Sequence, residues 1–218
     1  MTDAHCHFAR GEGRHFVCSP FTGSPGECDA VFLGTHPWRS GEYDPERLCV
    51  LLASDENAGV GEIGLDRLRE KTIPPRMRET FVSQLEIAAE FRRPVVLHGA
   101  KCWGEVAKEA KRFAGKIPAF LFHGFSRSEG LLPEIVAMNG YVSVGPAVLN
   151  SHAVNYRRLA AALPLDRLLA ETDFEEGADT PAIGEIVREI AALRGVDAGE
   201  LERILDANAE AFLRRDMI

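Results

Sequence analysis

The feature that most constrains the fold is a regular alternation of short apolar segments with longer amphipathic ones along the whole chain. The short segments have the length and apolar content of buried strands, and they span 2–7, 15–19, 30–35, 59–65, 94–98, 119–123, 140–144 and 167–172. The longer segments repeat apolar residues at helical spacing over 45–53, 75–93, 103–114, 129–138, 154–163, 181–193 and 198–215. Eight strands that alternate with helices predict an α/β fold, a (β/α)8 barrel of the TIM type.

The N-terminal third departs from this pattern. Between the first three strands there is room only for loops rich in Gly, Ser and Pro, such as 11–14 and 22–26, so we expect the first outer helices to be reduced or missing. The 218 residues show no internal repeat and no linker. We therefore expect one barrel domain over residues 1–218.

Composition excludes several classes of protein. Hydrophobic residues make up 45% and charged residues 27% of the chain, which is ordinary globular usage. No apolar run approaches the roughly 20 residues that span a bilayer, and the polar N-terminus does not resemble a signal sequence. Five cysteines without a C-x-x-C pair favour reduced thiols. We expect a soluble cytoplasmic protein with no membrane contact and no obligate protein partner.

The net charge of −8 argues against a surface that binds long nucleic acid through basic side chains. It does not exclude a nuclease, because bound metal ions supply positive charge locally. The charge therefore restricts how a nucleic acid would be bound rather than whether one is bound.

The sharpest local motif is Asp3-Ala4-His5-Cys6-His7, at the end of the first predicted strand. Side chains at i and i+2 of a strand share one face, so Asp3, His5 and His7 are expected to point together. Two imidazoles on one face can hold a divalent metal. Taken alone, such a motif more often reflects one hydrogen-bonded core histidine and one exposed histidine.

Four further metal-type ligands stand where an apolar strand opens into a loop, namely Glu62, His98, His123 and Asp173. In a barrel the carboxyl ends of all strands face one mouth, where active sites are built. The separations between the four residues match one, one and two strand–helix units of about 25 to 30 residues. We therefore expect these ligands to meet the two histidines of the first strand, from strands one, four, five, six and eight.

The ordered set of motifs resembles the TatD-type metal-dependent hydrolases of the amidohydrolase superfamily. It comprises Asp-x-His-x-His at 3–7, Gly-Thr-His-Pro at 34–37, Gly-Glu-Ile-Gly-Leu-Asp at 61–66, Pro-Val-Val-Leu-His at 94–98, His-Gly-Phe-Ser at 123–126 and Glu-Thr-Asp at 171–173. A tail segment, Asp-Ala-Asn-Ala-Glu-Ala-Phe at 206–212, is also similar. The resemblance runs nearly from end to end.

This resemblance implies a site with two divalent ions, for which Mg²⁺, Mn²⁺ and Zn²⁺ are candidates. One ion is expected on His5, His7 and Asp173, a second on His98 and His123, and Glu62 is expected to bridge them. The resemblance also implies hydrolysis of phosphodiester bonds at the ends of DNA or RNA. In that reaction Asp173 is the expected general base for a metal-activated water, with Glu62 as the second catalytic carboxylate.

Two departures from the family pattern affect substrate binding. Gly-Ala-Lys-Cys follows the histidine of strand five, where the family usually has Ser-Arg, so Lys101 is the expected replacement for the missing phosphate contact. Glu175 and Glu176 follow the last motif and bring two carboxylates to the mouth, where they repel a polyanion.

Other residues near the motifs have two interpretations each. His36 fits contact with substrate or a structural hydrogen bond to loop backbone. Arg127 fits contact with a phosphate or a solvated loop charge. Trp38 and Trp103 fit stacking on a nucleobase or, as is more common for isolated tryptophans, packing in the core.

Two alternative functions remain open on the sequence. The first is a hydrolase that cleaves a small amide, lactone or phosphoester on the same binuclear site, which the acidic mouth and the missing arginine favour. The second is a barrel that retains metal but acts as a partner protein, which the intact ligand set disfavours.

Overall fold

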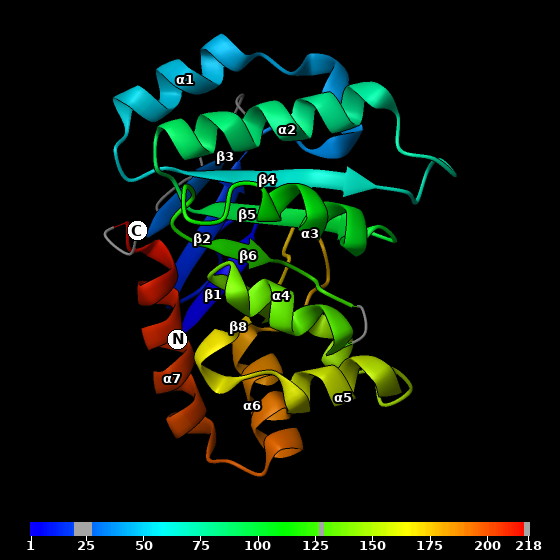
Figure 1. Ribbon diagram of the computed structural model, residues 1–218. Coiled ribbons are helices and arrows are strands. Elements are labelled where there is room, and N and C mark those ends of the chain that lie inside the picture. Colours follow the sequence, from blue (N-terminus) through cyan, green and yellow to red (C-terminus); the bar gives the residue numbers. More distant parts are fainter. Residues whose placement is uncertain (20–27, 127–128, 216–218) are drawn as a thin grey trace.

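Eight parallel strands form one sheet in chain order, so that each strand pairs with its neighbours in the sequence (Figure 1). The structure is a computed structural model that describes residues 1–19, 28–126 and 129–215. The strands are β1 (Thr2–Cys6), β2 (Arg14–Ser19), β3 (Ala30–Leu33), β4 (Gly59–Asp66), β5 (Val95–Ala100), β6 (Phe120–Phe122), β7 (Gly140–Val144) and β8 (Leu168–Ala170). All eight predicted strands are present.

The sheet curls into a nearly closed barrel, because residues that follow β8 bond to the end of β1. Asp173 N donates to His5 O at 3.0 Å, and His7 N donates to Phe174 O at 2.8 Å. These bonds lie at the carboxyl ends of the two strands. The predicted TIM-type barrel is confirmed.

Helices surround the barrel on its outside (Figure 1). They are α1 (Pro45–Ser54), α2 (Pro75–Glu90), α3 (Trp103–Lys111), α4 (Leu132–Ala137), α5 (Val154–Ala162), α6 (Ile183–Arg194) and α7 (Ala198–Leu213), with short 3₁₀ segments η1 (Pro37–Glu42), η2 (Glu129–Leu131), η3 (Pro146–Leu149) and η4 (Leu165–Arg167). As predicted, residues 7–13 between β1 and β2 form no helix, while the loop prediction for 22–26 lies outside the described residues. Within the described residues, no helix has the length and apolar character needed to span a membrane.

One end of the barrel is closed by an apolar plug from α7. The ring of Phe212 lies 6.3 Å from Phe16, 5.7 Å from Phe32 and 5.8 Å from Tyr141, measured between ring centroids. These three rings belong to β2, β3 and β7, so a single side chain joins strands from both halves of the sheet. The closed end leaves the opposite end, where the carboxyl ends of the strands meet, available for chemistry.

Irregular pairing occurs in the two strands that carry His5 and Glu62. The register of β1 against β2 shifts between Asp3 and Cys6, and that of β4 against β5 shifts between Val60 and Ile63. Such bulges re-aim side chains.

The bulge in β1 corrects one expectation, because Asp3 does not point with His5. The Asp3 carboxylate accepts hydrogen bonds from Thr172 N at 2.9 Å and Thr172 Oγ1 at 2.5 Å. It lines a separate cavity together with His15 and Ile183. Simple alternation along β1 is therefore wrong at this position.

Asn208 on α7 provides a test of how the tail stabilises the barrel. Its buried carboxamide donates to Leu165 O at 2.7 Å and to Leu168 O at 2.8 Å, at the start of β8. Asn208→Ala removes both donors, and we expect the free energy of unfolding to fall by about 2 to 3 kcal/mol. Denaturant unfolding followed by circular dichroism measures the change. Arg203→Ala, an exposed position on the same helix, is the control and should change stability by less than about 0.5 kcal/mol. Equal effects of the two substitutions would contradict this role.

Candidate metal centre

The six predicted metal ligands come together at the open end of the barrel. His5, Glu62 and His98 belong to β1, β4 and β5, whereas His7, His123 and Asp173 lie one to three residues beyond the ends of β1, β6 and β8. Three groups have one ligand atom from each member within 4.8 Å of the others: His5, His123 and Asp173; His5, His7 and Glu62; His36, Glu62 and His98.

The Glu62 carboxylate faces two separate pairs of imidazoles. Its Oε2 atom lies 3.9 Å from His5 Nε2 and 3.7 Å from His7 Nε2. Its Oε1 atom contacts His98 Nδ1 and lies 2.6 Å from His123 Nε2. One carboxylate therefore offers an oxygen to each of two neighbouring ligand sets, as a bridging ligand must.

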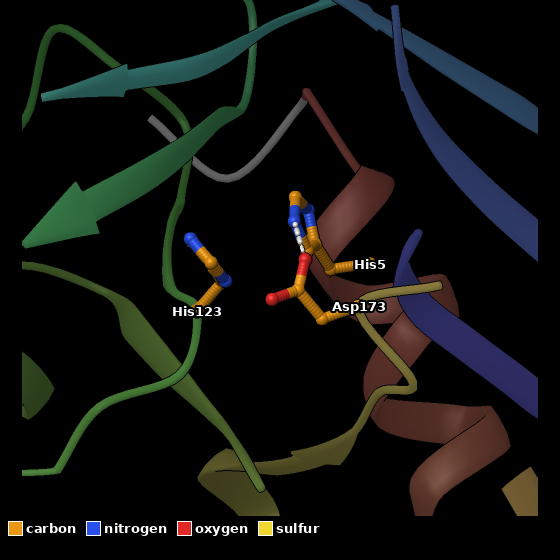
Figure 2. Close-up of side chains that lie close together, drawn as sticks. All are labelled: His5, His123 and Asp173. Atoms are coloured by element: carbon orange, nitrogen blue, oxygen red, sulfur yellow. Dashed lines mark ion pairs between the residues drawn. The ribbon is translucent and has the colours of Figure 1, made fainter. Parts of the chain in front are cut away.

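Asp173 lies beside the two histidines that face Oε2 of Glu62. Its Oδ1 atom lies 3.2 Å from His5 Nε2 and 3.6 Å from His7 Nε2. Figure 2 shows the Asp173 carboxylate beside the imidazole of His5, with His123 nearby. The ring centroids of His5 and His123 are 4.0 Å apart. Asp173 has a φ of 51°, a left-handed conformation that Asp tolerates better than most residues.

The donor atoms fit divalent metal ions. His5 is fully buried, yet neither of its ring nitrogens has a hydrogen-bond partner among the described residues, and the same holds for Nδ1 of His123. Buried polar groups are normally satisfied, so these ring nitrogens are available to bind a metal ion. Imidazole nitrogens and carboxylate oxygens together suit Zn²⁺, Mn²⁺ and related ions.

Electrostatics keep the central carboxylate charged. Burial alone would raise the pKa of Glu62, but the charges and hydrogen bonds of His123 and His98 outweigh burial and hold it well below its usual range. In return, Glu62 raises the pKa of His123 against the opposing effect of burial. A buried anion is stable here because imidazoles surround it.

Further carboxylates orient the histidines from outside. Asp66 Oδ2 lies 2.9 Å from His98 Nε2. Glu171 Oε1 lies 3.7 Å from His123 Nδ1 and accepts a hydrogen bond from Gly124 N at 2.7 Å. Such partners fix ring orientation and ligand basicity. No role was predicted for Glu171 from the sequence, although it stands in the Glu-Thr-Asp motif two residues before Asp173.

His36, predicted to contact substrate or to make a structural hydrogen bond, lies beside the candidate metal ligands Glu62 and His98. Its Nε2 atom is 4.0 Å from Glu62 Oε1, and its ring centroid is 4.7 Å from that of His98. Its Nδ1 atom also accepts a hydrogen bond from Trp38 N. His36 therefore makes a structural hydrogen bond and also lies at the candidate metal centre. Burial lowers the pKa of His36 to about 4, which leaves a neutral imidazole at physiological pH.

Of the two other residues predicted to bind substrate, the structure describes Lys101 but not Arg127. Lys101 is exposed directly after β5, at the open end, and its carbonyl oxygen accepts hydrogen bonds from the Arg67 guanidinium at 2.7 and 3.2 Å. Its contact with a phosphate stays a prediction. Arg127 lies outside the described residues.

Comparison with known proteins identifies the family. The model of the family described as TatD related DNase matches residues 27–214. The chain belongs to this family. The sequence-based resemblance to TatD-type hydrolases is therefore confirmed.

Individual TatD relatives agree with this assignment. A Cronobacter sakazakii protein named 3′-5′ ssDNA/RNA exonuclease TatD is 29% identical over 193 residues, which cover 81% of this chain and 73% of the relative. A Bacillus subtilis protein named uncharacterized metal-dependent hydrolase YabD is 27% identical over 202 residues, covering 86% and 79%. The crystal structure of YJJV, a TatD homolog from Escherichia coli K12, has a TM-score of 0.74 at 22% identity and covers 92% of this chain and 86% of its own. That structure supports the fold of this TatD-family chain.

Metal binding should stabilise the native state. An ion present at 100 times its Kd adds about 2.7 kcal/mol when it binds only folded protein. We expect Mn²⁺ or Zn²⁺ added to chelator-treated protein to raise Tm by about 5 to 10 °C, measured by differential scanning fluorimetry. His7→Ala should reduce the shift, whereas His152→Ala, at an exposed histidine, should not. Identical melting with and without saturating metal would argue against the centre.

Proposed function

We propose that this chain is a divalent-metal-dependent exonuclease that removes nucleotides from the 3′ end of single-stranded DNA or RNA. The observation that carries the proposal is the position of Glu62, whose two oxygens face two different sets of imidazoles. Two ions about 3.5 to 4 Å apart are the usual arrangement in metal-dependent phosphodiester hydrolysis. The substrate class and the polarity are taken from the named relatives.

The proposed division of ligands follows the distances. His5, His7 and Asp173 would hold one ion, His98 and His123 the other, and Glu62 would contribute one oxygen to each. When bound, such ions lower the pKa of a water nucleophile and neutralise charge on the phosphoryl oxygens.

Asp173 is the proposed general base. Its side chain is half exposed, so water reaches it, and Oδ1 is the oxygen directed at the two histidines of β1. Oδ2 is then available to accept the proton of the attacking water. Burial raises the pKa of Asp173, but the neighbouring His5 and His123 outweigh this and keep it below its usual value. The carboxylate is therefore ionised at neutral pH, as a base must be.

The charge around the mouth favours attack at a chain end. Glu42, Asp44 and Glu175 line the cavity of about 410 Å³ that opens above Glu62 and His7. These carboxylates outnumber the guanidinium groups of Arg39 and Arg47 in the lining and disfavour a long polyanion laid across the mouth. A single terminal phosphodiester that enters toward the metals meets less of this repulsion. The named activity of the relatives also favours a nuclease over hydrolysis of a small amide, lactone or phosphoester.

The proposal is tested with a short single-stranded oligonucleotide, labelled at either end, in the presence of Mg²⁺ or Mn²⁺. We expect a ladder from the 5′-labelled strand and early release of labelled mononucleotide from the 3′-labelled strand. Asp173→Asn should lower kcat by about 100-fold or more because the proton acceptor is lost. Glu176→Gln, an exposed carboxylate on the same loop, is the control and should retain activity.

Other outcomes would contradict this assignment. A ladder that starts from the 5′ end would refute the polarity. Full activity in Asp173→Asn would refute the base. Absence of cleavage with metal bound would direct the search to small-molecule substrates.

Lys101 offers a second test, directed at the phosphate. Lys101→Gln removes the charge at similar side-chain length, and we expect KM for oligonucleotides to rise about three- to tenfold with little change in kcat. Steady-state kinetics at low ionic strength measures the effect. Lys116→Gln, exposed between α3 and β6 at the other end of the barrel, should leave KM unchanged. An unchanged KM in Lys101→Gln would remove this residue from the binding site.

A further inference from the structure

The two tryptophans of the chain lie in opposite environments. Trp103 is 2% exposed and packs between Phe122 and Phe125 in the core. Trp38, on η1, is 44% exposed although it is a large apolar side chain. An exposed indole beside the candidate metal centre is available for a ligand wherever no other side chain covers it.

Trp38 is exposed but held in one orientation. The Trp38 side chain is one of the groups that lower the pKa of Asp66 against the opposing effect of burial, and the Asp66 carboxylate also contacts His98. The indole ring lies edge-to-face against His36, with centroids 4.9 Å apart, and the Arg69 guanidinium lies 3.7 Å from its centre on one face. The ring is therefore oriented by groups that also contact the metal ligands, so little conformational entropy is lost when a ligand stacks on it.

The exposed indole forms part of the wall of the cavity above the metal centre. Trp38 and His36 line this cavity of about 410 Å³ together with His7 and Glu62, whereas Arg69 does not line it. One face of the indole is thus covered by the arginine, and the ring also borders the space that leads to the metals.

The charges of this cavity favour a neutral group over a phosphate. Its lining carries four carboxylates, those of Glu42, Asp44, Glu62 and Glu175, and two guanidinium groups, those of Arg39 and Arg47. One of these, on Arg39, is paired with Glu42 at 2.9 Å. A flat neutral ring with hydrogen-bonding edges suits such a surface, whereas the phosphate is drawn to the metals.

We propose that Trp38 forms a stacking subsite for the nucleobase of the terminal nucleotide, whose phosphodiester lies at the metal centre. This inference rests on the proposed exonuclease function and adds where the base is recognised. Stacking is sequence-tolerant because every base has a π face, so the subsite recognises the presence of a base rather than its identity.

The first experiment compares oligonucleotides with an ordinary or an abasic 3′-terminal nucleotide. We expect the wild-type protein with Mn²⁺ to prefer the ordinary end by at least about fivefold in kcat/KM. Trp38→Ala should abolish this preference, Trp38→Phe should retain most of it, and Val50→Ala, an exposed apolar side chain on α1, should not affect it. An undiminished preference in Trp38→Ala would overturn the subsite.

A second experiment needs no turnover. Adenosine 5′-monophosphate should quench the fluorescence of the metal-loaded wild type, because Trp38 is the exposed tryptophan, and ribose 5-phosphate should not. In Trp38→Phe the quenching should disappear. Quenching that persists in this variant, or equal quenching by the two ligands, would overturn the subsite. If the wild type degrades no oligonucleotide, the proposed function fails and this titration still decides the subsite.

Discussion

The seam between β1 and β8 is the constraint on which the rest of the site depends. Backbone bonds from Asp173 to His5 and from His7 to Phe174 close the barrel, and each bond involves a candidate metal ligand. The Asp3 carboxylate adds two hydrogen bonds from Thr172, which lies 169 positions further along the chain. Ligands from the first and last strands therefore meet only when the barrel closes. Folding and metal binding are coupled for this reason, since an ion that joins both sides of the seam stabilises closure.

The two ends of the barrel have different contents, one apolar and one polar. The amino-terminal end of the barrel is filled with aromatic rings that surround Phe212, and the other end holds a buried carboxylate surrounded by histidines. A charged group is tolerated there because Glu62 has imidazoles on both oxygens, and Asp66 and Glu171 contact the far sides of two of those rings. Parallel strands of a barrel place their carboxyl ends at one mouth, which is why this polar network gathers at one end.

The proposed function requires an acidic chain to bind nucleic acid. The net charge of −8 and the carboxylates of Glu42 and Glu175 leave the metal centre as the attractive place for a phosphate. Affinity for the remainder of the nucleotide must then come from neutral contacts. The exposed indole of Trp38, in contact with His36 and Arg69, is the side chain at the mouth best suited to provide them.

The sequence by itself determined the barrel, the boundaries of most elements and the identity of the metal-type ligands. It did so because apolar periodicity and the position of a polar residue at a strand end are local properties, as at His98, His123 and Asp173. The family resemblance implied how those ligands divide around Glu62, whereas only the tertiary structure gave the distances to its two oxygens and placed His36 beside them. The tertiary structure also decided that Asp3 turns away from His5, since a bulge interrupts the alternation that a sequence pattern assumes. These outcomes depend on register between strands and on the closure of β8 against β1, which are set by packing between segments far apart in the chain.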